Sequence, residues 1–236
     1  MPDPPDPARW PFDLPPVRQV LERGLVFTTP VTFLVGENGT GKSTLVEALA
    51  EAYGIDVRGG HGARRYASPL EKSTLGANLR LTMAPGGRGM RGSRRAKGFF
   101  LRAESAMQVF EHMTGLPGYG DRDLREVSHG EGFLQVVEGR FTGPGLYLLD
   151  EPESALSFGS CLRLLATLDA LADAGGQIVC ATHSPLLAAL PGATIWELGE
   201  FGIRTSRWDE LALVDHWRRF LARPDAYLRH LADPAG

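Results

Sequence analysis

A glycine-rich segment near the start of the chain carries the residues whose types and spacing predict the most definite chemistry. It fits the phosphate-binding pattern G-x-x-x-x-G-K-[ST] at every fixed position, and its residues are Gly36, Glu37, Asn38, Gly39, Thr40, Gly41, Lys42, Ser43 and Thr44. Glycines let backbone N–H groups turn toward an anion, and the amino end of a following helix adds partial positive charge. We expect Lys42 to reach the β and γ phosphates of a nucleotide and the Ser43 hydroxyl to bind Mg²⁺.

The stretches on either side of this segment support the phosphate-loop interpretation. Residues 31–35 are apolar and largely β-branched, which is typical of a buried parallel strand. Residues 45–52 alternate apolar and polar side chains at helical spacing. A strand, a glycine loop and a helix start follow one another in the order that phosphate binding needs, and a chance glycine-rich turn would not explain that order.

Two acidic residues follow a second apolar run, residues 146–149. Because the carboxyl ends of parallel strands share one edge of a sheet, we expect Asp150 beside the phosphate loop, where it can help to hold Mg²⁺. Glu151 comes one residue later and points elsewhere, so it is the candidate general base that polarises the attacking water. The alternative is a strand that is simply ended by acids before a proline turn.

A histidine follows the next predicted strand, residues 177–182. A lone histidine after a strand usually carries no function. Here, however, His183 comes one strand after Asp150 and Glu151, so we expect it beside the γ-phosphate. There it can donate a hydrogen bond to the phosphate or orient the water, which makes Lys42, Glu151 and His183 the predicted catalytic residues.

Strands alternate with helices along the 236 residues, which predicts an α/β fold with a mostly parallel sheet flanked by helices. We interpret the chain as a single domain, residues 1–236, built as a P-loop NTPase core. Residues 56–128, where glycines break the pattern, are expected to form an inserted lid lobe with small antiparallel and helical parts. Further predicted strands cover residues 25–28, 78–83, 98–102, 194–198 and 203–208, and predicted helices cover residues 104–113, 133–137, 156–174, 211–221 and 226–231.

Composition and charge exclude several classes of protein. The formal net charge is −3, so there is no overall electrostatic drive toward nucleic acid or anionic lipid. No apolar run approaches the roughly 20 residues that span a bilayer, and the proline- and aspartate-rich start lacks the form of a secretion signal. Cys161 and Cys180 lie in apolar segments without ligand-like spacing, and we expect buried reduced thiols. These features predict a cytoplasmic protein without direct membrane insertion.

One segment departs from this charge balance, because residues 88–97 gather positive charges among glycines. The residues are Arg88, Arg91, Arg94, Arg95 and Lys97. A solvated loop and a loop that contacts nucleic-acid phosphates both fit this pattern, although no aromatic residues interleave for base stacking. The segment could also imitate the arginine-rich lid of a small-molecule kinase. Nucleic acid therefore stays open as a partner.

The phosphate loop, the strand acids and the histidine together resemble the ATP-binding-cassette (ABC) superfamily of ATPases over most of the chain. The resemblance implies binding of ATP and Mg²⁺, hydrolysis of ATP to ADP and phosphate, and a homodimer that forms head to tail on ATP binding. It also identifies Ser128 and Gly130 with the family's L-S-G-G-Q signature, which binds the γ-phosphate held by the partner subunit. Val127, His129 and Glu131 depart from that pattern.

Other family features are matched less closely. Ser157 stands where the D-loop pattern S-A-L-D has aspartate. The Q-loop glutamine of the family corresponds to Glu104 or to Gln108, and Glu104 is the residue that we assign to the metal site, through water. Phe12 or Trp10 could stack on adenine, but packing in the core or in the tail is the preferred interpretation.

Within the superfamily, the phrases Thr-His-Ser-Pro and Asp-Glu-Pro-Glu-Ser-Ala-Leu resemble small stand-alone bacterial ATPases related to the RecF and overcoming-lysogenization-defect groups. The chain shows no heptads and leaves no room for a long coiled coil between phosphate loop and signature. The predicted function is an ATP-dependent dimer switch coupled to an unidentified partner process. The alternatives are a nucleotide-binding subunit of a transporter and a DNA-associated repair or defence ATPase with little intrinsic turnover. A non-hydrolysing, ATP-gated binding module is a further rival class.

Overall fold

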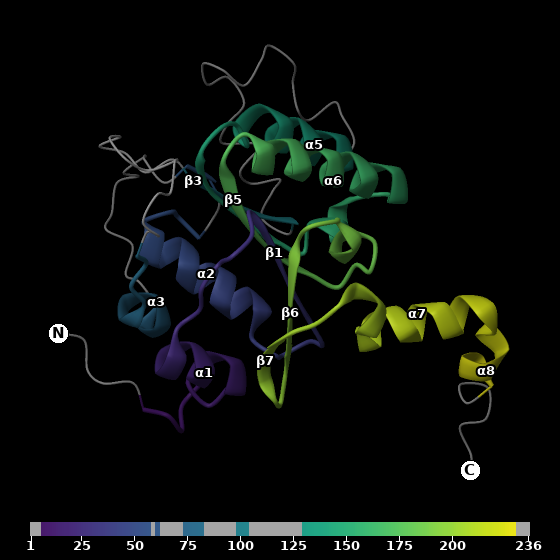
Figure 1. The fold of residues 1–236 in the computed structure, drawn as a ribbon, viewed down its shortest axis with the longest axis horizontal. Helices are drawn as coiled ribbons and strands as arrows, with labels where there is room; N and C mark the ends of the chain where they lie inside the picture. The colour runs from purple at the N-terminus through teal and green to yellow at the C-terminus, as the bar shows by residue number, and fades with distance from the viewer. Residues whose placement is uncertain (1–5, 58–59, 62–72, 83–97, 104–128, 230–236) are drawn as a thin grey trace.

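The computed structural model describes residues 6–57, 60–61, 73–82, 98–103 and 129–229. Among these residues, seven strands form one sheet with the order β2-β3-β4-β5-β1-β6-β7 (Figure 1). The five central strands β3, β4, β5, β1 and β6 run parallel to one another. At the two edges, β2 pairs antiparallel with β3 and β7 pairs antiparallel with β6. The strands are β1 (Val31–Gly36), β2 (Gly60–His61), β3 (Gly98–Arg102), β4 (Gly145–Asp150), β5 (Gly176–Thr182), β6 (Thr194–Gly199) and β7 (Gly202–Thr205).

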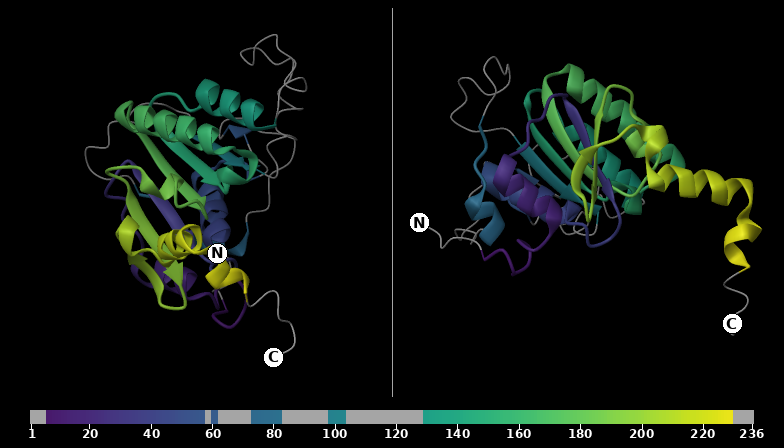
Figure 2. Two further views of the ribbon diagram at one scale, coloured as in Figure 1. Left: turned by 90° about the vertical axis from the view of Figure 1, so that its right-hand side faces the viewer. Right: turned by 60° about the horizontal axis from the view of Figure 1, so that its bottom comes forward.

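Helices cover both faces of the sheet (Figures 1 and 2). Side chains of α1, α2 and α3 share one buried cluster with the sheet, and side chains of α5 and α6 share the other. The helices α7 and α8 follow the last strand and project away from the sheet (Figure 1). The helices are α1 (Pro15–Arg23), α2 (Lys42–Tyr53), α3 (Thr74–Asn78), α5 (His129–Arg140), α6 (Phe158–Asp173), α7 (Ala212–Ala222) and α8 (Pro224–Leu228), with 3₁₀ turns at Pro152–Ala155, Leu187–Ala189 and Trp208–Glu210.

The central strands bury both of their faces. In β1, Phe33 packs in the cluster of α5 and α6, whereas Leu34 packs in the cluster of α2. In β3, Phe99 and Phe100 divide in the same way between the two clusters. All four side chains are at most 1 % exposed. Because helices cover both sides, these strands read in the sequence as continuous apolar runs rather than alternating ones.

The turn from β1 into α2 requires glycine at two positions. Gly41 has φ +94°, a left-handed conformation that side chains with a Cβ rarely adopt. A Cβ on Gly36 would lie 2.4 Å from the carbonyl oxygen of Leu198 on β6. The end of β1 therefore lies tightly against β6, and the loop that follows turns sharply into α2, which begins at Lys42.

The predicted α/β fold with a mostly parallel sheet is confirmed, but two predicted strands are wrong. Residues 25–28 form no strand, and Leu25 and Phe27 instead pack against the cluster of α2, which explains their apolar alternation. Residues 79–82 form no strand either, and Asn78, the first residue of that predicted strand, is the last residue of the helix α3. The Ser73 hydroxyl caps that helix by accepting a hydrogen bond from the Gly76 N–H at 3.1 Å. Both cysteines are free and buried, as expected.

The range 56–128, predicted as an inserted lobe, includes β3, and β3 pairs with β4 inside the main sheet. Most of that range, including the basic residues 88–97 and the predicted helix 104–113, lies outside the described residues. The division of the chain into a core and an inserted lobe therefore stays a prediction. In the part of the chain that the structure describes, no helix is long and apolar enough to cross a membrane.

Candidate functional site

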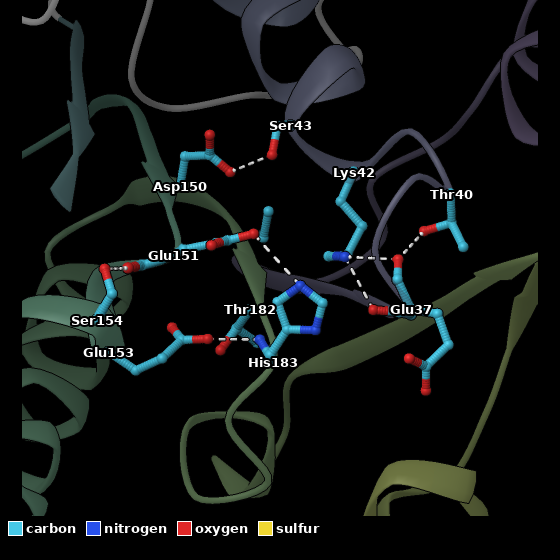
Figure 3. A network of polar contacts seen from close by, with 12 residues as sticks. Glu37, Thr40, Lys42, Ser43, Asp150, Glu151, Glu153, Ser154, Thr182 and His183 are labelled. Atoms are coloured by element: carbon cyan, nitrogen blue, oxygen red, sulfur yellow. Dashed lines mark hydrogen bonds and ion pairs between the residues drawn. The ribbon is translucent and has the colours of Figure 1, made fainter. Parts of the chain in front are cut away.

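Five of the predicted site residues follow three neighbouring strands and meet at the carboxyl end of the sheet (Figure 3). They are Lys42, Ser43, Asp150, Glu151 and His183. Strands β4, β5 and β1 are adjacent, and Asp150 at the end of β4 lies opposite Ala181 near the end of β5. His183 directly follows β5, while Lys42 and Ser43 begin α2 after the loop that leaves β1. The carboxyl ends of the strands thus bring together residues that are far apart in sequence.

Lys42 closes the phosphate loop from within. Its side chain is buried, and its Nζ donates hydrogen bonds to the carbonyl oxygens of Gly36 at 2.8 Å and Glu37 at 3.0 Å. Thr40 Oγ1 donates to the same Glu37 carbonyl at 2.9 Å. Burial lowers the pKa of Lys42, and the negative charge of nearby acids, Glu151 foremost, opposes that shift. The ammonium is therefore held inside the loop on two carbonyl oxygens, acceptors that phosphate oxygens could replace.

Ser43 and Asp150 form a hydroxyl–carboxylate pair beside Lys42. Ser43 Oγ donates a hydrogen bond to Asp150 Oδ1 at 2.9 Å, and Asp150 is only 2 % exposed. Mg²⁺ prefers hard oxygen ligands and is commonly held by one or two protein groups together with substrate phosphates and water. The donor set of Ser43 and Asp150 fits Mg²⁺ in that way.

Arg102 is a site residue that the sequence reasoning missed. Its Nε donates to Asp150 Oδ2 at 2.7 Å, its Nη2 lies 2.6 Å from the same oxygen, and the guanidinium also pairs with Glu47 of α2. Burial disfavours the charged form, but the hydrogen bonds and charges of Asp150 and Glu47 outweigh it, so the pKa of Arg102 is raised. Arg102 ends β3 directly opposite Asp150 of β4. Only the pairing of these two strands reveals the contact.

Glu151 has an unusual backbone conformation. Its φ of 49° and ψ of 50° are left-handed, and it is the one described residue other than glycine with positive φ. The conformation is held because the Glu151 N–H donates to Ala181 O at 2.9 Å and the Glu151 carbonyl accepts from Ser154. A residue other than glycine in the left-handed conformation lowers the stability of the folded state by about 1–2 kcal/mol relative to one in a right-handed or extended conformation. The turn brings Glu151 Oε1 to 3.3 Å from His183 Nε2 (Figure 3).

Glu153 supports His183 from the other side. The His183 backbone N–H donates to Glu153 Oε1, and burial raises the pKa of Glu153. Among the described residues, Glu153 Oε2 and His183 Nε2 are buried without a hydrogen-bond partner. His183 Nε2 is close to Glu151 but is not aligned for a hydrogen bond with it. Sequence reasoning gave Glu153 no role at the site, because its contact with His183 joins residues that follow two different strands.

Only one of the two residues of the predicted signature, Gly130, lies among the described residues. Ser128 lies outside the described residues, as do Glu104 and Gln108, so these three assignments stay predictions. Gly130 lies in the first turn of α5, where a Cβ would come 2.7 Å from the carbonyl oxygen of Ala155. Glycine therefore lets the start of α5 approach the turn that follows Glu151.

The structure also describes three residues that the sequence analysis discussed outside the core motifs, namely Ser157, Phe12 and Trp10. Ser157 caps α6, since its hydroxyl accepts a hydrogen bond from the Ser160 N–H at 3.2 Å. Phe12 is buried in the cluster of α2, in line with the core interpretation, and Trp10 is 70 % exposed.

Comparison with known proteins identifies the family to which the chain is similar. The profile of the ABC transporter family matches residues 26–154, and a profile described as an AAA domain matches residues 123–189. The cytochrome c biogenesis ATP-binding export protein CcmA of Salmonella typhi is 30 % identical over 191 residues, which cover 74 % of this chain and 86 % of that protein. CcmA of Saccharophagus degradans is 28 % identical over 171 residues, 65 % of this chain and 74 % of that protein. Among solved structures, the SMC head domain from Thermotoga maritima is similar with a TM-score of 0.46 and 14 % identity, over 78 % of this chain and 92 % of that one.

The fold and the site define the class first, an α/β P-loop nucleotide-binding protein. The sequence matches then show that the chain belongs to the ABC transporter family. It is accordingly an ATPase that binds ATP with Mg²⁺, which confirms the family, the enzyme class and the cofactors predicted from the sequence. The nearer relation to the RecF and overcoming-lysogenization-defect groups stays a prediction.

Proposed function

We propose that Lys42, Ser43, Asp150, Glu151 and His183 form one catalytic half-site for ATP hydrolysis and that two copies of the chain complete it. The observation that carries the proposal is the convergence of these five side chains at the carboxyl edge of β1, β4 and β5. Ser43 reaches Asp150 at 2.9 Å, and Glu151 comes within 3.3 Å of His183. The phosphate loop lies directly beside both pairs (Figure 3).

Each side chain has a role that follows from its place. Lys42 exchanges the carbonyl oxygens of Gly36 and Glu37 for the β- and γ-phosphate oxygens of ATP. Ser43 and Asp150 hold Mg²⁺, which when bound neutralises charge on the phosphate oxygens. Lys42, Ser43 and Asp150 form the phosphate and metal wall of the site. The side that carries Glu151 and His183, the water wall, is left for the attacking water.

The acids and the histidine supply the proton chemistry. Glu151 takes a proton from the water while the water oxygen bonds to the γ-phosphorus. The bond between the γ-phosphorus and the β–γ bridging oxygen breaks, which releases ADP and phosphate. His183 orients the water or donates to the γ-phosphate, and Glu153 holds the His183 backbone in place. The left-handed turn at Glu151 separates its carboxylate from that of Asp150, so one acid serves the metal and the next serves the water.

The test of this half-site is Glu151→Gln. The amide keeps the size of the side chain but accepts a proton far less readily, so we expect turnover to fall by about 10²-fold or more. Binding of a fluorescent ATP analogue with Mg²⁺ should remain close to that of the unaltered protein. Glu210→Gln is the control, since Glu210 lies in the exposed 3₁₀ turn before α7 and should change neither quantity. Normal hydrolysis by Glu151→Gln would show that Glu151 is not the base.

The second half of the proposal is the head-to-tail pair. Ser128 and Gly130 from one copy face the γ-phosphate held by Lys42 of the other, so ATP joins the subunits and hydrolysis separates them. The glycine at the start of α5, packed against Ala155 beside the Glu151 turn, supports a link between the signature and the hydrolytic acid. Specific activity should rise with protein concentration across the range in which the pair forms. Glu151→Gln with MgATP should run as a dimer in gel filtration. Specific activity that stays constant through dissociating dilutions would reject the shared site.

A second candidate function is the nucleotide-binding subunit of an export system. It is favoured by the 30 % identity to an ATP-binding export protein over most of both chains. Measuring ATP turnover with membrane extract, DNA and RNA in separate arms distinguishes it from a DNA-associated ATPase, because only the true partner class should stimulate turnover. A cytoplasmic location is part of either version and stays a prediction.

A further inference from the structure

Arg102 contacts the carboxylate that the proposed mechanism assigns to Mg²⁺. Both Nε and Nη2 of Arg102 address Asp150 Oδ2, at 2.7 and 2.6 Å. The other oxygen, Asp150 Oδ1, already accepts the Ser43 hydroxyl at 2.9 Å. Both oxygens of this buried carboxylate therefore have partners within the protein, and one of those partners is a full positive charge.

The surroundings make this contact an electrostatic rather than a packing contact. The Asp150 side chain is 3 % exposed and that of Arg102 is 25 % exposed. In such a site, charge-assisted hydrogen bonds are stronger than they are in water. A carboxylate with this little access to solvent is stabilised by positive charge. Lys42 contributes some of it from nearby, and Arg102 supplies the cation at hydrogen-bond distance.

Glu47 gives the guanidinium a second acceptor. It stands on α2, one turn beyond Ser43, and its side chain is 36 % exposed. When a cation takes over Asp150, Arg102 can remain on Glu47 and face solvent. Departure from Asp150 therefore does not leave a buried charge unpaired, which is the usual obstacle to breaking such a pair.

We propose that Arg102 is a built-in counter-cation that competes with Mg²⁺ for Asp150 and thereby sets the Mg²⁺ concentration at which the protein binds nucleotide. This inference rests on the proposed role of Asp150 as a metal ligand. Arg102 acts as a positioning residue, because it touches the metal ligand and not the reacting phosphate. With Asp150 committed to Mg²⁺, Arg102 would keep its pairing with Glu47 alone.

The experiment measures binding of a fluorescent ATP analogue while Mg²⁺ is titrated. Arg102→Gln should lower the Mg²⁺ concentration at half-maximal binding by about tenfold, the factor that corresponds to losing one charge-assisted hydrogen bond. Arg204→Gln is a matched control. Arg204 also directs Nε and Nη2, both at 2.8 Å, to one oxygen of a buried acid, Glu197, but it does so on β7. This variant should leave the Mg²⁺ midpoint unchanged.

A second measurement does not involve nucleotide. Without Mg²⁺, Arg102→Gln should melt several degrees below the unaltered protein, since Asp150 loses its cation. Mg²⁺ alone should restore most of that loss in Arg102→Gln and none of the loss in Arg204→Gln. A purely structural arginine would lower stability in the same way but would not create this rescue by Mg²⁺.

The outcomes separate the inference from the proposed function. Asp150→Asn should raise the Mg²⁺ midpoint by tenfold or more, and an unchanged midpoint there would remove Asp150 from the metal site and the inference with it. If Asp150→Asn behaves as expected while Arg102→Gln leaves the midpoint unchanged or raises it, only the inference fails. Where Arg102→Gln does not fold, Arg102→Lys replaces it. The shorter, single-point cation cannot grip Asp150 and Glu47 together, so its midpoint should lie below that of the unaltered protein, and an unchanged midpoint overturns the inference.

Discussion

The two walls of the site differ in how their polar groups are satisfied. On the phosphate and metal wall, Lys42 has two carbonyl acceptors and Asp150 has both oxygens occupied. On the water wall, Glu151 is held in a left-handed turn, and among the described residues Glu153 Oε2 and His183 Nε2 have no hydrogen-bond partner. One wall rests on internal partners that substrate must replace, and the other keeps unused hydrogen-bonding capacity.

This difference has a physical reason. A charge that must bind phosphate or Mg²⁺ cannot remain buried alone, so the fold gives Lys42 and Asp150 temporary partners. A base and a water-orienting histidine need a free lone pair or proton at the moment of reaction, so saturating them would remove their function. The cost falls on stability, through the strained turn and the unsatisfied atoms. Predictions that remove groups from each wall test this division.

We expect the largest effect on the phosphate and metal wall, from Lys42→Ala. Removing the ammonium should reduce ATP turnover by about 10²–10³-fold, because it deletes a preorganised positive charge at the phosphates. The two carbonyl partners should lose little when the lysine goes, since Gly36 is only partly buried at the end of β1 and Glu37 is exposed. The melting temperature should therefore change far less than turnover. A turnover loss below tenfold would mean that Lys42 only closes the loop.

The next effect concerns support of the water wall, with Glu153→Ala. The variant leaves the His183 backbone N–H without its acceptor and should lower the free energy of unfolding by about 1–3 kcal/mol. Turnover should fall as well, because His183 is no longer held beside Glu151. Urea unfolding and turnover are measured together. Lower stability with full turnover would contradict a positioning role for Glu153.

The same carboxyl group predicts a pH dependence. Burial raises the pKa of Glu153 in the folded protein, so the folded state binds its proton more tightly than the unfolded state does. Stability should therefore fall as pH rises from the ordinary glutamate pKa through the raised one. Glu153→Gln removes this contribution, so its stability relative to the unaltered protein should increase with pH over that window. Equal pH slopes for the two proteins would contradict the assignment of the raised pKa.

The smallest effect is expected outside both walls, with Trp208→Phe. Trp208 Nε1 donates to the carbonyl oxygen of Pro185 at 2.7 Å, in the loop that follows His183. Because this hydrogen bond lies near the surface, its loss should cost no more than about 1 kcal/mol in urea unfolding. Turnover should stay within twofold of normal. A larger loss of turnover would show that the water wall depends on the base of α7.

The local motifs were predictable because their meaning depends on short spacing. The phosphate loop, Asp150 with Glu151, and His183 each follow an apolar run that reads as a strand, and all three strands are present. Shared strand direction then suffices to bring their carboxyl ends to one edge. Alternation was less reliable where tertiary packing rather than pairing produced it, as at Leu25 and Phe27.

The sequence by itself determined which residues can bind phosphate, hold a metal and move a proton, because those capacities reside in side-chain type and local spacing. Only the tertiary structure decided that Arg102 faces Asp150, that Glu153 holds His183 and that Glu151 turns left-handed. These contacts join β3 to β4 and β4 to β5, and the order of strands in a sheet follows from packing across the whole chain. No local pattern of residues specifies which strand will lie next to which.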